Sequence, residues 1–433
     1  MLPRKREIFR RLAITSGRPA FDEKLHVGRP NLGNKARLLE RINEVLESGW
    51  LTNNGPYLQE FERRIAALTG VKHCIAVCNA TVGLEIAIRG LGLVGEVIVP
   101  SFTFAATAHA LQWAGVTPVF CDVDPATHTL DVRDVERCIT PRTTAILGVH
   151  LWGNACDTGT LEKIARRHDL KLLYDAAHAL GCSHSGRMIG NFGQAEVFSF
   201  HATKFCNSFE GGAITTNDDR LAERFRALRN FGMTADGVAH EVGTNGKMSE
   251  IAAAMGVTSL ESLDEFVAVN QTNYRAYKKH LNGVPGVKLF KHRESNRNNF
   301  QYVIVEVDKA AAGLSRDELQ RILHAENVMA KSYFSPGCHR LDAYRRHGHR
   351  ALPVTEQLAE RTLALPTGSA VGEKEVATIC RIVATAVRQA VYEAKFKQAE
   401  ETVQAGRRCG TELVWGTLQV GLFAAEMTPG LVG

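Results

Sequence analysis

Several common signatures are missing from this chain of 433 residues. It has no GxxxxGK[ST] stretch, and its GxGxxG match, GLGLVG from Gly90, comes before the strand-like EVIVP instead of following a strand, so neither the P-loop nor the phosphate-binding loop of nicotinamide-dependent enzymes is in place. It also has no GxSxG elbow and no CxxC pair, and its histidines are scattered without metal-ligand spacing. These absences argue against dinucleotide, P-loop and serine hydrolase chemistry, and we expect no metal site.

The chain also lacks a strong charge of one sign and a long hydrophobic run. Its 52 basic and 46 acidic residues give a net charge of +6 without long basic clusters. We therefore expect no nucleic-acid partner. The nearest apolar run, LVWGTLQVGLFAA from Leu413, is too short to span a bilayer and contains glycines. We expect no membrane association.

Cysteine usage indicates a reducing compartment. The ten cysteines are scattered, and most fall in apolar segments, where they act as small hydrophobic residues. The opening MLPRKREIFRRLAITSG is basic but has no apolar core of a secretory signal. A cytoplasmic protein with free thiols is therefore expected.

From about residue 57 to 265, short apolar segments alternate with helical patterns. HCIAVC, EVIVP, TPVFCDVD, TTAILGV, KLLYD, AEVFSF and GGAITTND have the character of buried strands. The helix YLQEFERRIAALT should end at Gly70. This alternation predicts an α/β domain with a mostly parallel sheet and helices on both faces.

A long helical stretch, which could contain a bend, begins at about residue 249 and leads to a smaller α+β domain. That domain holds the strand QYVIVEV and a helix whose Ser315 and Glu318 have capping-box spacing. The expected organisation is an N-terminal segment (1–49), a large domain (50–265), a small domain (266–396) and a tail of unknown structure (397–433).

Because ligands of open parallel sheets bind at the carboxyl ends of the strands, the residues just after each strand are candidates for a site. Asn79, Ala80 and Thr81 open a helix after the first strand, which suits either an anion site or a simple helix cap. Phe104 lies in a turn and could stack on a ligand ring, although spacing alone favours a packing role.

Two later strand ends add charged or polar groups. Asp175 ends KLLYD and is followed by His178; taken alone, Asp175 is better explained as a helix cap. Ser199 and Lys204 flank a turn in FSFHATK. A phosphate cradle, an aromatic platform, a strand-end carboxylate and a lysine, in that order, are the parts of a pyridoxal phosphate site. Lysine suits covalent attachment because its amine loses its charge readily when desolvated.

These residues lie in motifs that resemble the DegT/DnrJ/EryC1/StrS family of sugar aminotransferases. The resemblance covers about residues 15 to 390 and includes WLTNNGP, PSFTFAATAHA, VFCDVDPATHTLD, YDAAHALG, SFHATK and TNGKMSEIAAAMG. Within this family, the chain most resembles the enzymes that aminate C4 of dTDP-4-keto-6-deoxyglucose, as on the desosamine pathway. The segments that carry this resemblance are GRPAFDEKLHVGRPN, WLTNNGP and YFSPGCH. The family implies an aspartate-aminotransferase-like fold of type I and a homodimer whose active sites lie at the subunit interface.

The resemblance also implies a role for each site residue. Lys204 would attach the cofactor, Asp175 would pair with its ring nitrogen, Phe104 would stack on the ring, and His178 would lie near the 3-oxygen. Thr81, the backbone of Val82 and Ser199 would hold the phosphate, with Asn245 reaching it from the neighbouring subunit. In the family's NxRMS motif, this chain has Lys247 in place of arginine. A lysine cannot make the bidentate contact that an arginine could make at that position.

The expected activity is transfer of an amino group from L-glutamate to the 4-keto carbon of a dTDP-linked 4-keto-6-deoxyhexose, in deoxyaminosugar and antibiotic biosynthesis. Freed Lys204 would act as the general base, with ping-pong kinetics. The alternatives are amination at C3, another nucleotide carrier, or a catalytically silent partner protein on the same fold. Related dehydratases would be expected to carry histidine at the lysine position, so Lys204 favours transamination.

Overall fold

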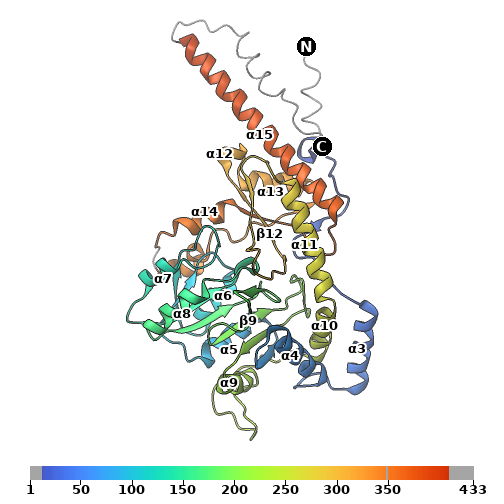
Figure 1. Cartoon of the computed structure of the whole chain (residues 1–433), viewed down its shortest axis with the longest axis vertical. Coiled ribbons are helices and arrows are strands. Elements are labelled where there is room, and N and C mark those ends of the chain that lie inside the picture. Colours follow the sequence, from blue (N-terminus) through green and yellow to red (C-terminus); the bar gives the residue numbers. More distant parts are fainter. Residues whose placement is uncertain (1–11, 348–349, 409–433) are drawn as a thin grey trace.

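A seven-stranded sheet forms the centre of the larger part of the molecule (Figure 1). The computed structural model describes residues 12–347 and 350–408. Strand β10 is antiparallel to both of its neighbours, and the other paired strands are parallel. In spatial order the strands are β2 (His73–Val77), β10 (Gly212–Thr216), β9 (Ala195–Ser199), β6 (Lys171–Asp175), β5 (Thr143–Val149), β3 (Glu96–Pro100) and β4 (Thr117–Cys121). All seven strands predicted from the apolar segments are confirmed.

Helices cover both faces of this sheet, as the short and doubly buried strands require. Successive strand residues face opposite sides, so Ile75 packs in one core and Ala76 in the other. The core with Ile75 contains α5 (Ala80–Gly90), α6 (Ala105–Trp113) and α9 (Asp219–Arg229). The opposite face carries α4 (Pro56–Thr69) and α10 (Glu250–Glu261) at one end and α7 (Val132–Cys138) and α8 (Thr158–Arg167) at the other.

Local signals place several helix ends. Helix α4 ends as predicted at Gly70, whose φ of 72° is the left-handed conformation that glycine adopts easily. Helix α13 (Arg316–Ala325) begins with the predicted capping box between Ser315 and Glu318. Between β6 and β9, the chain forms a small hairpin of β7 (Ser183–His184) and β8 (Arg187–Met188).

A second region is built on a three-stranded antiparallel sheet of β11 (Val287–Leu289), β12 (Val303–Val307) and β14 (Thr362–Leu365). Helix α11 (Leu263–His280) leads into it, and the break from α10 at Ser262 is the bend considered for the long helical stretch. Besides α11 and α13, the helical elements after residue 262 are α12 (Lys309–Ala312), η2 (Cys338–Arg340), η3 (Asp342–His347), α14 (Pro353–Arg361) and α15 (Glu373–Arg408), and a further short helix, η1 (Leu151–Gly153), follows β5.

The segments near the two ends of the chain form further strands and helices. Strand β1 (Leu25–His26) pairs with β13 (Val328–Met329) of the second region, between the short helix α2 (Ala13–Ser16) and α3 (Lys35–Ser48). Helix α15 projects from the body (Figure 1) and continues beyond residue 396, so part of the expected tail is helical. The basic segment 1–11 and the apolar stretch from Leu413 lie outside the described residues. The domain boundaries stay a prediction.

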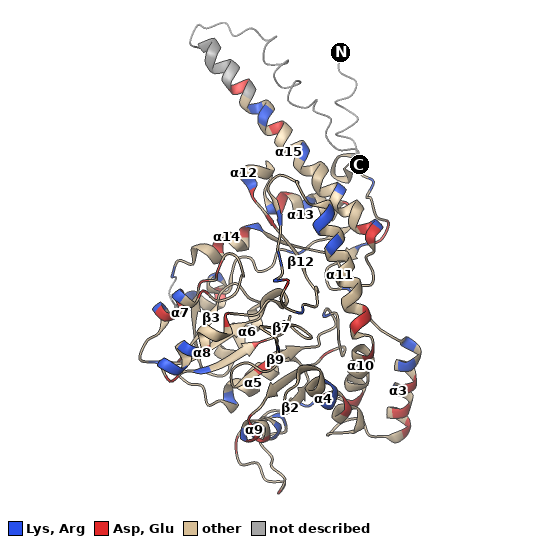
Figure 2. Ribbon diagram, viewed as in Figure 1, with Lys and Arg blue, Asp and Glu red and all other residues tan. Residues whose placement is uncertain are grey.

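The charged side chains do not gather by sign. Figure 2 shows acidic and basic residues mixed along outer helices such as α3 and α15. In the described part of the chain, no helix combines the length and the apolar character needed to cross a bilayer.

Candidate active site

The carboxyl ends of β2, β9 and β6 meet at one edge of the sheet. Gly212, the first residue of β10, pairs with both Val77 and Ser199. Asp175 at the end of β6 pairs with Val197, two residues before Ser199. Helix α5 starts just beyond Val77, so this edge brings together the start of α5, Ser199 and Asp175.

The expected phosphate cradle lies at the start of α5. The Asn79 side chain caps the helix by accepting a 2.9 Å hydrogen bond from the Val82 N–H, so the capping role left open by the sequence is present. Thr81 and Ser199 are partly exposed beside it. A Cβ on Gly212 would lie 2.7 Å from the Ala80 nitrogen. Glycine at this position therefore allows β10 to lie against the start of the helix.

Asp175 is buried, with 7% of its surface exposed. Its Oδ2 accepts a 2.8 Å hydrogen bond from the Thr107 hydroxyl, and its Oδ1 accepts a 3.0 Å bond from the Ala177 N–H. Burial raises the pKa of the Asp175 carboxyl, while these donors and the charge of Lys204 oppose the rise. Each carboxylate oxygen has a donor, but no basic side chain among the described residues forms an ion pair with Asp175.

Lys204 follows β9 in the FSFHATK turn. Its Nζ donates a 3.3 Å hydrogen bond to the Tyr302 hydroxyl and lies 5.8 Å from the centre of that ring. Burial of the amine lowers the pKa of Lys204 to about 8, although the negative charge of Asp175 works against this shift. The amine is therefore far closer to losing its proton at neutral pH than an exposed lysine.

His178 lies three residues after Asp175, in the turn beyond β6. Its ring stacks on Trp152 with centroids 5.5 Å apart, and it lies 4.4 Å from the ring of Tyr302. Burial, followed by the charge of Lys204, holds the pKa of His178 well below its usual value. The imidazole is therefore neutral near pH 7, with one N–H to donate.

Phe104 is the residue before α6, and 62% of its surface is exposed. The packing role that its spacing favoured is therefore wrong. An exposed phenyl ring at a helix start is free to cover a flat ligand.

The TNGKM segment lies beside the end of β2. The Gly246 carbonyl accepts a 2.8 Å hydrogen bond from the Cys78 N–H, and Lys247 forms an isolated bridge with Val77. Asn245 is exposed. The Lys247 amine donates to Asn230 Oδ1 at 3.0 Å and lies 4.7 Å from the centre of the Phe231 ring, so it is engaged within its own chain.

The site also contains residues that the sequence did not single out. Thr107, Trp152 and Tyr302 each contact one of the predicted residues. Thr107 lies within the motif PSFTFAATAHA, one helical turn after Thr103, and could have been found there. Tyr302 precedes β12 and belongs to the second region, so no local pattern connected it with Lys204.

These groups fit pyridoxal phosphate. The cofactor's ring nitrogen needs a carboxylate, and Asp175 is buried without an ion pair among the residues described. Its aldehyde needs an amine that loses a proton readily, which the lowered pKa of Lys204 provides. Its phosphate needs a helix start with hydroxyl groups, which α5, Thr81 and Ser199 supply.

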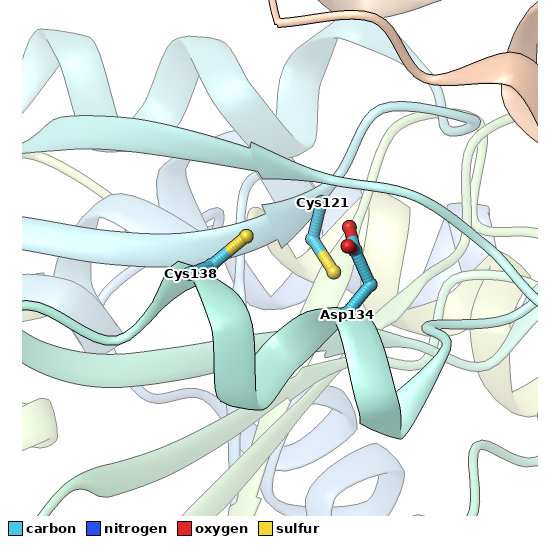
Figure 3. Close-up of side chains that lie close together, drawn as sticks. All are labelled: Cys121, Asp134 and Cys138. Atoms are coloured by element: carbon cyan, nitrogen blue, oxygen red, sulfur yellow. The ribbon is translucent and has the colours of Figure 1, made fainter.

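A separate cluster of possible metal ligands lies on β4 and α7. Ligand atoms of Cys121, Asp134 and Cys138 all lie within 4.8 Å of one another (Figure 3). The guanidinium of Arg350, however, donates to Asp134 Oδ2 at 3.0 Å and to Cys138 Sγ at 2.7 Å. A fixed positive charge at these atoms opposes a bound cation. The cluster is better explained as a polar contact that joins α7 to the segment before α14.

Comparison with known proteins places this geometry in a family. The model of the DegT/DnrJ/EryC1/StrS aminotransferase family matches residues 33–384. The dTDP-4-amino-4,6-dideoxy-D-glucose transaminase of Escherichia coli is 33% identical over 368 residues, 84% of this chain and 98% of that protein. GDP-perosamine synthase of Caulobacter vibrioides is 35% identical over 359 residues, 82% of this chain and 95% of that protein.

Solved structures agree with these matches. The crystal structure of DesI in the presence of its TDP-sugar product is 51% identical, with a TM-score of 0.86 over 90% of this chain and 100% of DesI. The structure of DesV from S. venezuelae, in complex with a ketimine intermediate, is 33% identical with a TM-score of 0.77, over 82% of this chain and 95% of DesV. The aspartate-aminotransferase-like fold expected from the sequence is confirmed. The chain is a pyridoxal phosphate-dependent enzyme that belongs to the DegT/DnrJ/EryC1/StrS aminotransferase family.

Proposed function

We propose that the protein transfers an amino group from L-glutamate to the C4 keto carbon of a dTDP-linked 4-keto-6-deoxyhexose. The observation that carries the chemistry is the position of two groups at the carboxyl ends of the neighbouring strands β9 and β6: the Lys204 amine, whose pKa is lowered, and the buried Asp175 carboxylate. Support for the substrate comes from relatives named dTDP-4-amino-4,6-dideoxy-D-glucose transaminase and from the likeness to DesI.

In this proposal Asp175 pairs with the cofactor's protonated ring nitrogen, and Thr107 and the Ala177 N–H keep the carboxylate ionised and oriented. Phe104 covers one side of the ring, and the neutral His178 donates a hydrogen bond near the 3-oxygen. Thr81, the Val82 backbone and Ser199 hold the phosphate. For the Val82 N–H to contribute, it would have to be shared between Asn79 and the phosphate.

Pyridoxal phosphate, when bound, supplies a sink for the electron pair left behind when a proton leaves the donor's α-carbon. Lys204 Nζ takes that proton, because its lowered pKa leaves a usable fraction of free base near pH 7. The same amine returns a proton at C4 of the sugar in the second half of the reaction. The scheme predicts ping-pong kinetics, since glutamate and the sugar visit one site in turn.

We also propose a cytoplasmic homodimer in which Asn245 of each subunit reaches the other subunit's phosphate site. Two features support the dimer: Asn245 is exposed, and so are Trp50 and Leu51, at 49% and 51%, in the WLTNNGP segment. The free thiols of the nine described cysteines support the compartment.

The substrate assignment is tested by incubation with dTDP-4-keto-6-deoxyglucose and L-glutamate, with the product's amine located by NMR. The expected product carries nitrogen at C4, and the GDP-linked 4-keto-6-deoxyhexose should react more slowly. An amine at C3 would support the C3-aminating alternative and overturn the substrate proposal. Absence of cofactor absorbance after pyridoxal phosphate is added would support the silent-partner alternative.

A further inference from the structure

Tyr302 is the hydrogen-bond partner of the catalytic amine. Its hydroxyl lies 3.3 Å from Lys204 Nζ, and its ring centre lies 5.8 Å away. No carboxylate in the described part of the chain lies within ion-pair distance of this amine; Asp175 acts on it only through space. The polar contact that fixes Nζ therefore comes from a tyrosine of the second region.

The Tyr302 ring cannot easily move away from this contact. Only 6% of its surface is exposed. His178 lies 4.4 Å away and Trp152 lies 5.3 Å away, centre to centre, at interplanar angles of 46° and 66°. Two rings at different angles hold the phenol, so its hydroxyl remains in one place.

The residues just before Tyr302 also form hydrogen bonds with the larger part of the molecule, which is built on the seven-stranded sheet. The buried Asn298 donates a 2.9 Å hydrogen bond to the Gly153 carbonyl, next to Trp152. The buried Asn299 donates to the carbonyls of His178 and Leu180, both at 3.0 Å. The segment is thus aligned against the same turn that carries His178.

We propose that Tyr302 is a positioning residue that holds the Lys204 amine through its hydroxyl whenever Lys204 is not attached to the cofactor. This inference rests on the proposed role of Lys204 and adds a residue to that site. The second region would then contribute directly to the site, because a tyrosine just before β12 sets the position of Lys204 Nζ.

The hydrogen bond also has a predictable effect on protonation. The phenol accepts from the amine, and an accepting oxygen stabilises the charged ammonium more than the neutral amine. Tyr302 therefore works against burial, which lowers the pKa of Lys204. The Tyr302→Phe variant keeps the ring but removes the acceptor, so Lys204 should lose its proton at lower pH.

The test is made on the full-length protein freed of cofactor. Each sample reacts with trinitrobenzenesulfonate, which modifies only unprotonated amines, and mass spectrometry of the peptide that contains Lys204 gives the rate at each pH. In Tyr302→Phe the midpoint of the pH dependence of Lys204 modification should fall by about one pH unit. The size of this shift is expected because a hydrogen bond to a charged group is stronger than one to a neutral group. An unchanged or raised midpoint would overturn the proposal.

A matched control is Tyr277→Phe. Tyr277 is also fully buried, and its hydroxyl donates to the Pro366 carbonyl at 2.8 Å. This variant should keep the wild-type midpoint for Lys204. A second variant, Tyr302→Leu, should lower the midpoint at least as much as Tyr302→Phe. This experiment uses no sugar substrate, so an unchanged midpoint would not count against the proposed amination. Likewise, a negative result in the NMR experiment would not count against the contact between Tyr302 and Lys204.

Discussion

The Thr107 hydroxyl donates a 2.8 Å hydrogen bond to Asp175 Oδ2 and so links the first turn of α6 to the end of β6. Thr107 is fully buried and lies 3.0 Å from the hydroxyl of Thr103, measured between the two Oγ1 atoms. The other carboxylate oxygen is held by the Ala177 N–H. Burial raises the pKa of Asp175, and the Thr107 bond is one of the contacts that opposes the rise. Thr107 therefore helps to keep a buried carboxylate ionised.

Thr107→Val should shift the acidic side of the pH–rate profile upward. Loss of a donor to an ionised group raises the pKa of Asp175 further, by about one unit if the bond contributes ~1.5 kcal/mol. Activity requires the ionised Asp175 carboxylate. As the pH is lowered, the variant should therefore lose activity at a higher pH than the wild type does. The control is Thr69→Val, a buried threonine whose hydroxyl donates to the Ile65 carbonyl at the end of α4. Equal profiles for Thr107→Val and wild type would contradict the role given to Thr107.

Capture of pyridoxal phosphate by the cofactor-free protein should become faster with rising pH, reach half of its maximal rate at about pH 8 and level off above about pH 9. The reason is that burial lowers the pKa of Lys204 to about 8. About one tenth of such amines are free base at pH 7, against roughly one in 3,000 for an ordinary lysine. Stopped-flow absorbance measures the rate. A rate that still climbs tenfold per unit above about pH 9 would indicate an unshifted lysine.

Phe104→Ala should weaken cofactor binding without lowering the melting temperature of the cofactor-free protein. The ring is 62% exposed, so its removal leaves no cavity. Loss of a stacking contact worth ~0.5–1.5 kcal/mol predicts an increase in Kd of about 2- to 10-fold. Phe102→Ala is the contrast, because Phe102 is fully buried and its loss should cost about 3–5 kcal/mol of stability. A large fall in melting temperature for Phe104→Ala would favour the packing role instead.

Sites shared between subunits can be tested with two inactive variants. Lys204→Ala removes the amine, and Asn245→Asp places a negative charge where a phosphate from the other subunit is expected. When the two are mixed and allowed to exchange, half of the dimers are hybrids with one intact site, so about a quarter of wild-type activity should return.

The matched control for that mixture combines Lys204→Ala with Asp175→Asn. Both residues come from the same subunit, so no hybrid contains an intact site and activity should stay absent. Recovery in neither mixture would count against a role for Asn245 across the interface.

Much of the fold could be predicted because its signals are local. The seven strands are apolar runs of five to seven residues, and the Gly70 stop and the Ser315 capping box are fixed by neighbouring residues. The family motifs then supplied the site, since Lys204 and Asp175 lie inside them. Roles for individual strand ends stayed open until the motifs were considered together.

Other features depend on distant parts of the chain. Tyr302 contacts Lys204 from 98 residues away in sequence, and Trp152 contacts His178 from the neighbouring strand end. Neither contact has a local signal, because tertiary packing creates both. Phe104 was misjudged for a related reason: spacing shows that a residue lies in a turn, but not whether anything covers it.

The most direct test of the proposed chemistry is the identity of the amine that binds the cofactor. The protein is loaded with pyridoxal phosphate, reduced with borohydride to make the attachment permanent, digested and examined by mass spectrometry. We expect a pyridoxyl group on Lys204, no such group in Lys204→Ala, and no amination by that variant. Attachment at another lysine in the wild-type protein, or retained turnover by Lys204→Ala, would contradict the role assigned to this residue.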